Sequence, residues 1–190
     1  MTAGPSSFRP LAAADLPLLL AWCRAPHAAR WFGRGRTDEE ILAEYLPAIS
    51  GETPVRPFLV SLAGRPIGMI QWERMGDSPD FQAAYAIADP DTANCDVIIG
   101  EADFAHRGLG APMIRQFLGE VVFADRRITC CVIDPEVGNA IAIRAYEKAG
   151  FRFLKDLADD GEGNAVRLLE FRRERLPAPA AEPTLKPAPE

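Results

Sequence analysis

Apolar and polar residues follow two different periods along the chain, and each period indicates one kind of element. Apolar residues three or four positions apart predict helices, most clearly where Met113, Phe117 and Val121 share one face. Short apolar runs bounded by Gly, Pro, Asn or Asp predict strands. The predicted helices span 15–23, 37–45, 109–123 and 139–148, and the predicted strands span 8–11, 58–62, 67–73, 81–87, 97–99, 128–133, 151–157 and 165–171.

Local signals predict where several of these elements begin and end. Thr37 followed three residues later by Glu40 has the spacing of a capping box and predicts a helix start. We expect Asp15 to cap the first helix and Gly150 to cap the end of the last one. The turn residues 63–66 lie between two strand-like runs and predict a hairpin.

The order of these elements is strands, then strand, helix, strand and helix, then strands again. This order predicts a mixed α/β (α+β) fold with a right-handed crossover at its centre. We expect one domain over residues 1–175. Residues 176–190 contain five prolines in fifteen positions and predict an extended Pro/Ala-rich tail, because such a segment cannot pair its backbone groups regularly.

Composition narrows the class of protein. The 190 residues are 48% hydrophobic and 25% charged, which excludes a disordered chain, a collagen-like fibre and a disulfide-stabilised miniprotein. The formal net charge of −6 argues against nucleic acid or an anionic membrane as the main partner. No apolar run approaches the roughly 18 residues of a membrane span. The run from Leu16 to Trp22 follows an acid rather than a basic cluster, so we expect no secretory signal.

The four cysteines, at positions 23, 95, 130 and 131, form no CxxC pair. Cys130 and Cys131 are adjacent, and neighbours in a strand point to opposite faces, which suits neither a mutual disulfide nor a zinc site. We therefore predict buried free thiols, no bound metal and a cytoplasmic location.

The segment after the predicted strand 97–99 is the first that indicates chemistry. It reads Ala105-His106-Arg107-Gly108-Leu109-Gly110-Ala111, and a helix follows at once. Glycines let a backbone approach a ligand closely, and the N–H groups at a helix N-terminus favour a phosphate. Gly108-x-Gly110 alone is compatible with either a phosphate-binding loop or a plain tight turn.

A second segment is longer and more specific. Asp134-Pro135-x-x-x-Asn139-x-x-Ala142-Ile143-Arg144-Ala145-Tyr146-Glu147-Lys148-Ala149-Gly150-Phe151 resembles the C-terminal motif of the GCN5-related N-acetyltransferases, the GNAT family. Residues 105–111 resemble the pyrophosphate-binding motif of the same family, and the resemblance extends over residues 8–172. It implies the GNAT fold, in which a twisted, mostly antiparallel sheet is flanked by helices and opens into a V between its central strands.

The resemblance also implies acetyl-CoA as cosubstrate. Pantetheine would pair with the strand that contains Ile98 and Ile99, where a bulge would aim an N–H at the thioester carbonyl. Pyrophosphate would lie on the loop of His106, Arg107, Gly108, Leu109, Gly110 and Ala111. The chain departs from the family at Ala105, where Arg or Gln is usual. Either Arg107 or His106 would supply the missing donor, unless His106 is simply an exposed loop residue.

Two residues are the candidates for catalysis. Tyr146 matches the family tyrosine that protonates the departing thiolate, and a phenol pKa near 10 keeps that proton available at neutral pH. Asp96 would assist deprotonation of the acceptor amine, and Asn139 would lie near the pantetheine arm. From the residue pattern alone, Tyr146 is also compatible with a core aromatic, and Asp96 with an ordinary aspartate at a strand edge.

Segments 27–33, 44–47 and 64–68 resemble one branch of the family, the bacterial aminoglycoside 6′-N-acetyltransferases, which are antibiotic-resistance enzymes. This likeness implies direct acetyl transfer to the 6′-amine of an aminoglycoside, a cationic small molecule. Asp96 would bind the acceptor ammonium, Asp134 would add negative charge, and Trp31 and Tyr45 would help to form the acceptor wall. Desolvated carboxylate–ammonium pairs are strong and selective, which suits a polycation.

Other acceptors stay open. Siderophore hydroxylysine acyltransferases share the layout but tend to have a histidine where this chain has Asp96. The segment 80–91 lacks the paired tryptophans and dense acids expected of the aminoglycoside branch. A polyamine acceptor, a protein N-terminus and a non-catalytic acyl-CoA-binding sensor are the further alternatives. Both a monomer and a homodimer agree with the sequence.

Overall fold

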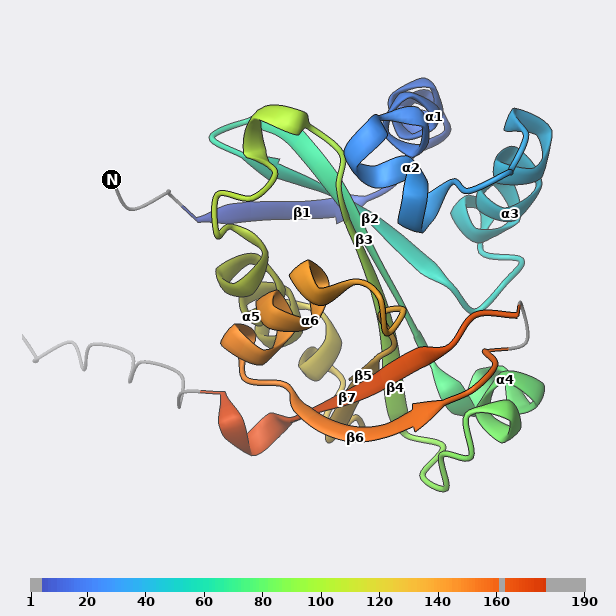
Figure 1. The fold of residues 1–190 in the computed structure, drawn as a ribbon, viewed down its shortest axis with the longest axis vertical. Coiled ribbons are helices and arrows are strands. Elements are labelled where there is room, and N and C mark those ends of the chain that lie inside the picture. Colours follow the sequence, from blue (N-terminus) through green and yellow to red (C-terminus); the bar gives the residue numbers. More distant parts are fainter. Residues whose placement is uncertain (1–4, 161–162, 177–190) are drawn as a thin grey trace, which may run out of the picture.

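The computed structural model describes residues 5–160 and 163–176, which form one seven-stranded sheet with helices on both faces (Figure 1). The order of strands in the sheet is β1-β2-β3-β4-β5-β7-β6. The strands are β1 (Ser6–Pro10), β2 (Arg56–Leu62), β3 (Arg65–Arg74), β4 (Thr92–Ile99), β5 (Cys130–Ile133), β6 (Arg152–Leu157) and β7 (Val166–Arg172). The helices are α1 (Leu16–Arg24), α2 (Pro26–Phe32), α3 (Asp38–Ser50), α4 (Pro79–Ala84), α5 (Gly110–Glu120) and α6 (Ala140–Ala149).

The sheet opens between β4 and β5, the one parallel pair among these strands. Their ladder has three pairs and ends where Asn94 faces Val132. On its other side, β4 stays paired with β3 from Ala93 to Ile99. The far half of β4 therefore has an open edge, which confirms the predicted V and the mostly antiparallel sheet.

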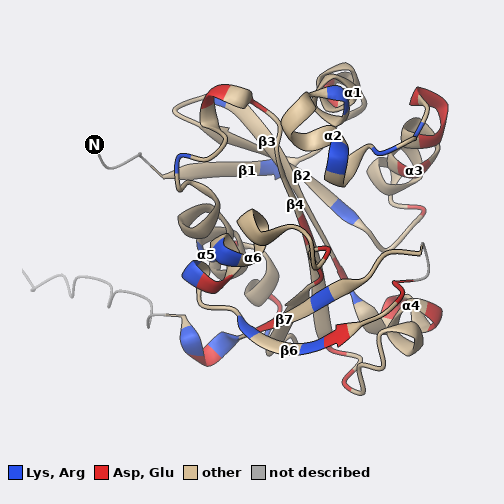
Figure 2. Cartoon of the chain, in the orientation of Figure 1, with Lys and Arg blue, Asp and Glu red and all other residues tan. Residues whose placement is uncertain are grey.

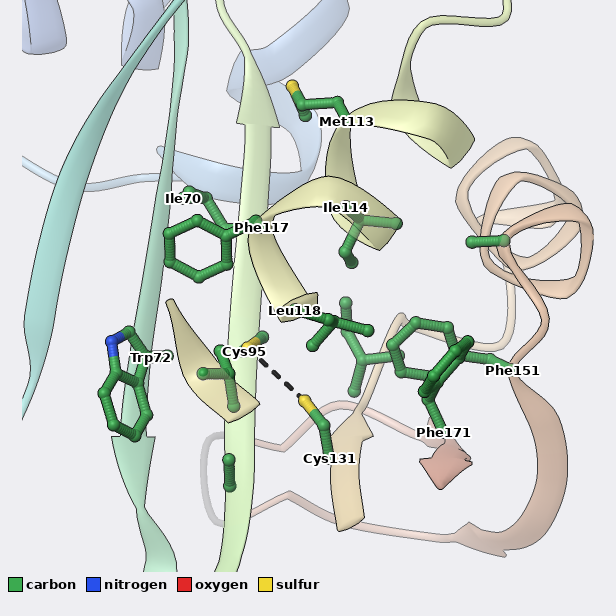
Figure 3. Close-up of a cluster of buried hydrophobic side chains, with 14 of the residues drawn as sticks. Ile70, Trp72, Cys95, Met113, Ile114, Phe117, Leu118, Cys131, Phe151 and Phe171 are labelled. Atoms are coloured by element: carbon green, nitrogen blue, oxygen red, sulfur yellow. Dashed lines mark hydrogen bonds between the residues drawn. The ribbon is translucent and has the colours of Figure 1, made fainter. Parts of the chain in front are cut away.

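One face of the sheet packs against α5 and α6. Phe117 of α5 is fully buried against the central strands, and Phe151 and Phe171 lie next to each other at the start of β6 and in β7 (Figure 3). The opposite face is covered at one end by α1, α2 and α3, which contact Met69 of β3 and Ile98 of β4. This second cluster ends before Gln71 and Asp96, so that part of the sheet face is left to form a cavity floor.

Several local predictions are confirmed. The Thr37 hydroxyl accepts a hydrogen bond from the Glu40 N–H, and the Glu40 carboxylate accepts one from the Thr37 N–H. Gly150 ends α6 in the left-handed conformation at φ 106°. The hairpin of β2 and β3 is present, and so are the strands at β6 and β7.

The predicted strand at 81–87 is wrong, because this segment contains α4 and the turn after it. Pro79 occupies the first position of α4, where the proline ring already fixes φ near the helical value. Phe81 and Tyr85 are four residues apart, and their ring centroids lie 4.3 Å from each other. Helix α2 was not predicted, and it too begins at a proline, Pro26.

Of two finer predictions, the cap at Asp15 is also wrong. Asp15 precedes α1, but its carboxylate accepts from the Ala12 N–H and forms an ion pair with Arg9 instead of capping that helix. The register of β3 against β4 continues without a shift from Arg74–Ala93 to Gly68–Ile99. Directly after β4, the N–H groups of Gly100 and Glu101 both donate to the Ile67 carbonyl, at 2.9 and 3.1 Å, which is the hydrogen-bond pattern of a bulge and agrees with the bulge predicted near 97–100. The open edge of β4 before this point arises from the early end of β5.

The four cysteines are buried free thiols, as predicted. Cys130 and Cys131 point to opposite faces of β5, where each belongs to a different apolar cluster. The Cys131 Sγ lies 3.4 Å from the Cys95 Sγ across the β4–β5 junction, as Figure 3 shows.

None of the helices in the described ranges has the length and apolar character that crossing a membrane requires. The predicted tail lies outside the described residues except for Leu176, which contacts the core on the α5 side.

We predict that Gly100→Ala destabilises the protein, because its new Cβ would lie 2.0 Å from the Trp22 ring of α1. Overpacking of this kind costs about 1–3 kcal/mol of unfolding free energy. Gly119→Ala in α5 is the matched control, since its Cβ would meet nothing closer than Leu176 at 3.6 Å. The control should gain up to about 1 kcal/mol from helix propensity. Urea denaturation measures both, and equal effects would contradict the predicted contact.

Candidate active site

A cavity of about 380 Å³ occupies the opening between β4 and α6. Its walls are the open edge of β4 at Val97, Ile98 and Ile99, the α6 side chains including Tyr146, part of α2, and the loop before α5. An open strand edge offers backbone N–H and C=O groups to an extended ligand. The cavity therefore suits an amide-containing chain such as pantetheine.

The loop before α5 brings backbone N–H groups to one end of this cavity. Gly108 has φ 77°, which favours glycine, and a Cβ added there would meet nothing within 4 Å. His106 also has a positive φ of 59°. Ala105, His106 and Gly110 line the cavity, and α5 begins directly after Leu109. The first N–H groups of a helix have no partner within it, so this loop can bind a phosphate group.

The predicted loop residues therefore have different positions. His106 and Gly110 lie on the cavity wall with Ile98 and Ile99, whereas Arg107 and Gly108 are exposed at the turn, and Leu109 and Ala111 lie beside it. Asn139 caps α6, accepting from the Ala142 N–H at 3.1 Å, and also lines the cavity.

A second cavity, of about 440 Å³, lies against the uncovered face of the sheet. Its floor consists of alternate residues from two paired strands, Gln71 and Glu73 of β3 and Asn94 and Asp96 of β4. Side chains two positions apart in a strand share a face, which explains why the residues between them, Trp72 and Cys95, belong to the core instead. Phe81 and Tyr85 of α4 form part of its wall.

Carboxylates dominate this second cavity. Six acidic residues line it together with one arginine, Arg36: they are Glu44, Glu73, Asp96, Asp134, Glu136 and Asp160. Figure 2 shows further acidic positions at the starts of the neighbouring helices α3 and α4. Glu44 pairs with Arg36 and Glu136 with Arg34, but Glu73, Asp96 and Asp134 form no ion pair with any described residue. The cavity is therefore prepared for a cationic ligand.

Asp96 lies at the inner end of this cavity and accepts a hydrogen bond from the Gln71 amide at 3.0 Å. Desolvation, and after it the nearby charge of Asp134, raises its pKa to about 7. A carboxyl group with such a pKa can accept a proton at physiological pH and release it again.

Asp134 follows β5 and accepts hydrogen bonds from the Tyr85 hydroxyl at 2.5 Å and from the Asn94 amide at 3.3 Å. Burial raises its pKa, and these two hydrogen bonds oppose that rise by stabilising the carboxylate. Asp134 is thus held in place by two neutral donors, and its charge remains available to a ligand.

Tyr146 of α6 lines both cavities, so its side chain lies where they meet. Burial raises the pKa of its phenol far above the ordinary value, and the charges of Asp96 and Asp134 add to the shift. The hydroxyl therefore keeps its proton at neutral pH. The side chain is half-buried and packs against the core, as the core alternative required, but it also lines both cavities.

The structure separates the two predicted wall residues. Trp31 of α2 lines both cavities, whereas Tyr45 of α3 is 1% exposed and belongs to the core beneath the cavity. The predicted site residues did not include Gln71, Glu73, Asn94 or Tyr85. Alternation along β3 and β4 could have indicated the first three, but the wrong strand at 81–87 concealed Tyr85.

Comparison with known proteins decides the family. The profile of the acetyltransferase (GNAT) domain matches residues 12–158. The chain belongs to the GNAT acetyltransferase family. This membership confirms the predicted fold and the prediction of an acetyl-CoA-dependent N-acetyltransferase.

Similar proteins include an aminoglycoside N(6′)-acetyltransferase type 1 of Klebsiella pneumoniae, 29% identical over 163 residues, which are 84% of this chain and 79% of the relative. A solved structure of AAC(6′)-Ib with parmomycin and acetyl-CoA has a TM-score of 0.80 and 28% identity, covering 90% of this chain and 95% of that one. Another, with coenzyme A and kanamycin, has a TM-score of 0.78 and 28% identity over 89% and 95%.

The raised pKa of Asp96 predicts a pH-dependent rate for the GNAT enzyme. Its carboxylate must be ionised to accept a proton, so kcat/KM should rise with pH through about 7 and then level off. Asp96→Asn should lower the rate by about 100-fold or more and remove this rise. Initial rates from pH 5.5 to 9 test both statements, and an unchanged profile in the variant would refute them.

A stability measurement provides the control. The folded pKa of Asp96 exceeds its unfolded value of about 3.9, so the folded state binds the extra proton, and wild-type stability falls as pH rises through that window to about 7. The Tm of Asp96→Asn relative to wild type should therefore increase between pH 5 and pH 8. A constant difference would show that Asp96 titrates normally.

Proposed function

We propose that this enzyme transfers the acetyl group of acetyl-CoA directly to the 6′-amine of an aminoglycoside. The observation that supports this acceptor is the acidic cavity. Tyr146 lines it, and so do three carboxylates that form no ion pair with any described residue: Glu73, Asp96 and Asp134. Charged amines of a polycation would satisfy these carboxylates, and the likeness to aminoglycoside N(6′)-acetyltransferases agrees with that chemistry.

Acetyl-CoA supplies the acetyl group as an activated thioester. The residues present fit this cosubstrate, because the open edge of Val97–Ile99 can pair with amide groups and the loop at 105–110 can bind phosphates. Asn139 lines the same cavity.

Asp96 prepares the acceptor for attack. An ammonium group has no lone pair, so it must lose a proton before it can act as a nucleophile. Asp96 accepts that proton, while Gln71 holds the carboxylate in place through its hydrogen bond. Asp134 keeps the local potential negative and attracts the cationic amine to this end of the cavity.

Tyr146 completes the reaction on the other side. Its side chain lines both cavities and its hydroxyl retains its proton, so it can protonate the sulfur as the carbon–sulfur bond breaks. One residue thus removes a proton from the nucleophile and another gives a proton to the leaving group, with both reactants bound at once.

Acetyl-CoA-dependent thiol release tests the acceptor. We expect rapid release with kanamycin and slow release with simple amines, polyamines and hydroxylysine, because only a polycation can contact several carboxylates of the cavity. A pair of aminoglycosides that differ only in an amine or a hydroxyl at the 6′ position is the matched control. Equal rates for this pair would disprove 6′ transfer, and faster release with another amine would reassign the acceptor.

Tyr146→Phe removes the proposed acid and keeps the ring in its half-buried place. We expect kcat to fall by about 10²-fold or more while the KM values change little, since loss of a general acid affects the transition state. Acetyl-CoA analogues with a more acidic leaving thiol should recover part of the rate. Full turnover by the variant, or no recovery with the better leaving group, would exclude the acid role.

A further inference from the structure

Helix α2 and the two residues after it lie across the mouth of the V. We refer to residues 27–34 as the strap. This segment contributes to the walls of both cavities through Trp31 and Phe32. It contacts β4 on one side of the opening and the loop between β5 and α6 on the other, so it connects the two arms that the sheet itself leaves apart.

The first connection is a hydrogen bond to the open edge of β4. The His27 Nε2 lies 2.9 Å from the carbonyl oxygen of Ile99. A carbonyl can only accept, so this nitrogen carries the proton and donates. The Gly100 N–H donates to the carbonyl of Ile67 on β3, which places the backbone groups of the preceding residue, Ile99, on the opposite edge, toward the V. His27 therefore binds the strand edge that faces the cosubstrate cavity.

The second connection reaches the other arm. The Arg34 guanidinium donates to both carboxylate oxygens of Glu136, at 3.1 and 3.2 Å. Between the two connections, the Trp31 ring lies over Gly138, where an added Cβ would be 3.9 Å from it. The Arg30 guanidinium covers the same ring, 4.6 Å from its centroid. Trp31 is thereby held between the two arms.

We propose that His27 and Arg34 are positioning residues that hold Trp31 as a shared wall, so that binding in one cavity affects binding in the other. This inference rests on the proposed function only in requiring that both cavities be occupied for turnover. A ligand in the cosubstrate cavity restrains the strap through Trp31 and through the strand edge at Ile99 that His27 binds, and an acceptor then meets a wall that is already ordered. Loss of either connection leaves the chemistry of Asp96 and Tyr146 intact and weakens binding on both sides.

Three substitutions test the proposal in the full-length enzyme. His27→Ala should raise the Kd for coenzyme A and the KM for the acceptor by about three- to tenfold each, the range expected for one lost hydrogen bond, with kcat within about twofold of wild type. His27→Gln should restore both values, because its amide N–H can take the place of Nε2. Arg34→Ala should raise both by about twofold, since an exposed ion pair contributes little.

Arg9→Ala is the matched control. The Arg9 side chain is as exposed as that of Arg34, at 52% and 54%, and each arginine pairs with one carboxylate. Arg9 lies on β1, outside the strap. The substitution should leave every value unchanged. Thermal unfolding of each variant excludes a general loss of folding, which would lower the active fraction and leave Kd and KM as they were.

Two results would overturn the proposal. If His27→Ala weakened coenzyme A alone, His27 would be only a wall residue of the cosubstrate cavity. If neither constant changed, the strap would have no positioning role. Calorimetry with coenzyme A needs no acceptor, so this part of the test stands even if aminoglycosides are not substrates. The KM measurement then uses whichever amine is turned over fastest.

Discussion

The active site depends on the point where the β4–β5 ladder ends. Asn94 and Val132 form its last pair, and the two strands separate beyond it. Asp96 lies two residues after Asn94, and Asp134 lies two residues after Val132. Both carboxylates are therefore equally far along their strands from this last pair and on the same face of the sheet. Tyr146 lies on α6, the helix that follows β5, and lines the cavities on both sides of this opening. A longer β4–β5 ladder would close the opening between the two strands, and a shorter one would move Asp96 and Asp134 apart.

The same geometry makes ionisation of these carboxylates unfavourable in the free protein. They are brought together in a region with little solvent, and no cationic side chain among the described residues pairs with Asp96, Asp134 or Glu73. Burial of like charges raises the pKa of Asp96 and lowers the stability of its ionised form. Under the proposed function, a cationic acceptor relieves this repulsion when it binds. The site thus favours its ligand partly because the unliganded arrangement is unfavourable.

Sequence reasoning was most successful where local chemistry determines structure. The capping box at Thr37, the glycine after α6 and the hairpin at 63–66 are short-range signals, and each is confirmed. Asp96 and Tyr146 were found through motif resemblance, and the structure brings them to the same cavity. Helix α4 was misassigned, because six residues rich in apolar side chains have too few turns for periodicity to distinguish a helix from a strand.

The depth of Tyr45 and the contribution of Glu73 could not be predicted either, since each depends on where the α1–α3 cluster stops covering the sheet. That boundary is set by packing between residues far apart in the chain, and no local pattern records it. The carboxylates of the cavity come from α3, β3, β4 and the loops after β5 and β6. Their convergence is a property of the sheet order, so composition in the segment 80–91 was a poor guide to the charge of the site.

The alternation along β3 and β4 has an evolutionary consequence. Every second residue, such as Trp72 and Cys95, belongs to the core, whereas those between them line the acidic cavity. If that cavity binds the acceptor as proposed, substitution at Gln71, Glu73 or Asn94 alters which amine is recognised without disturbing the packing beneath α5 and α6. New acceptors can therefore be acquired one floor residue at a time on an unchanged scaffold, and related enzymes can diverge in substrate while retaining one fold and one route for the acetyl group.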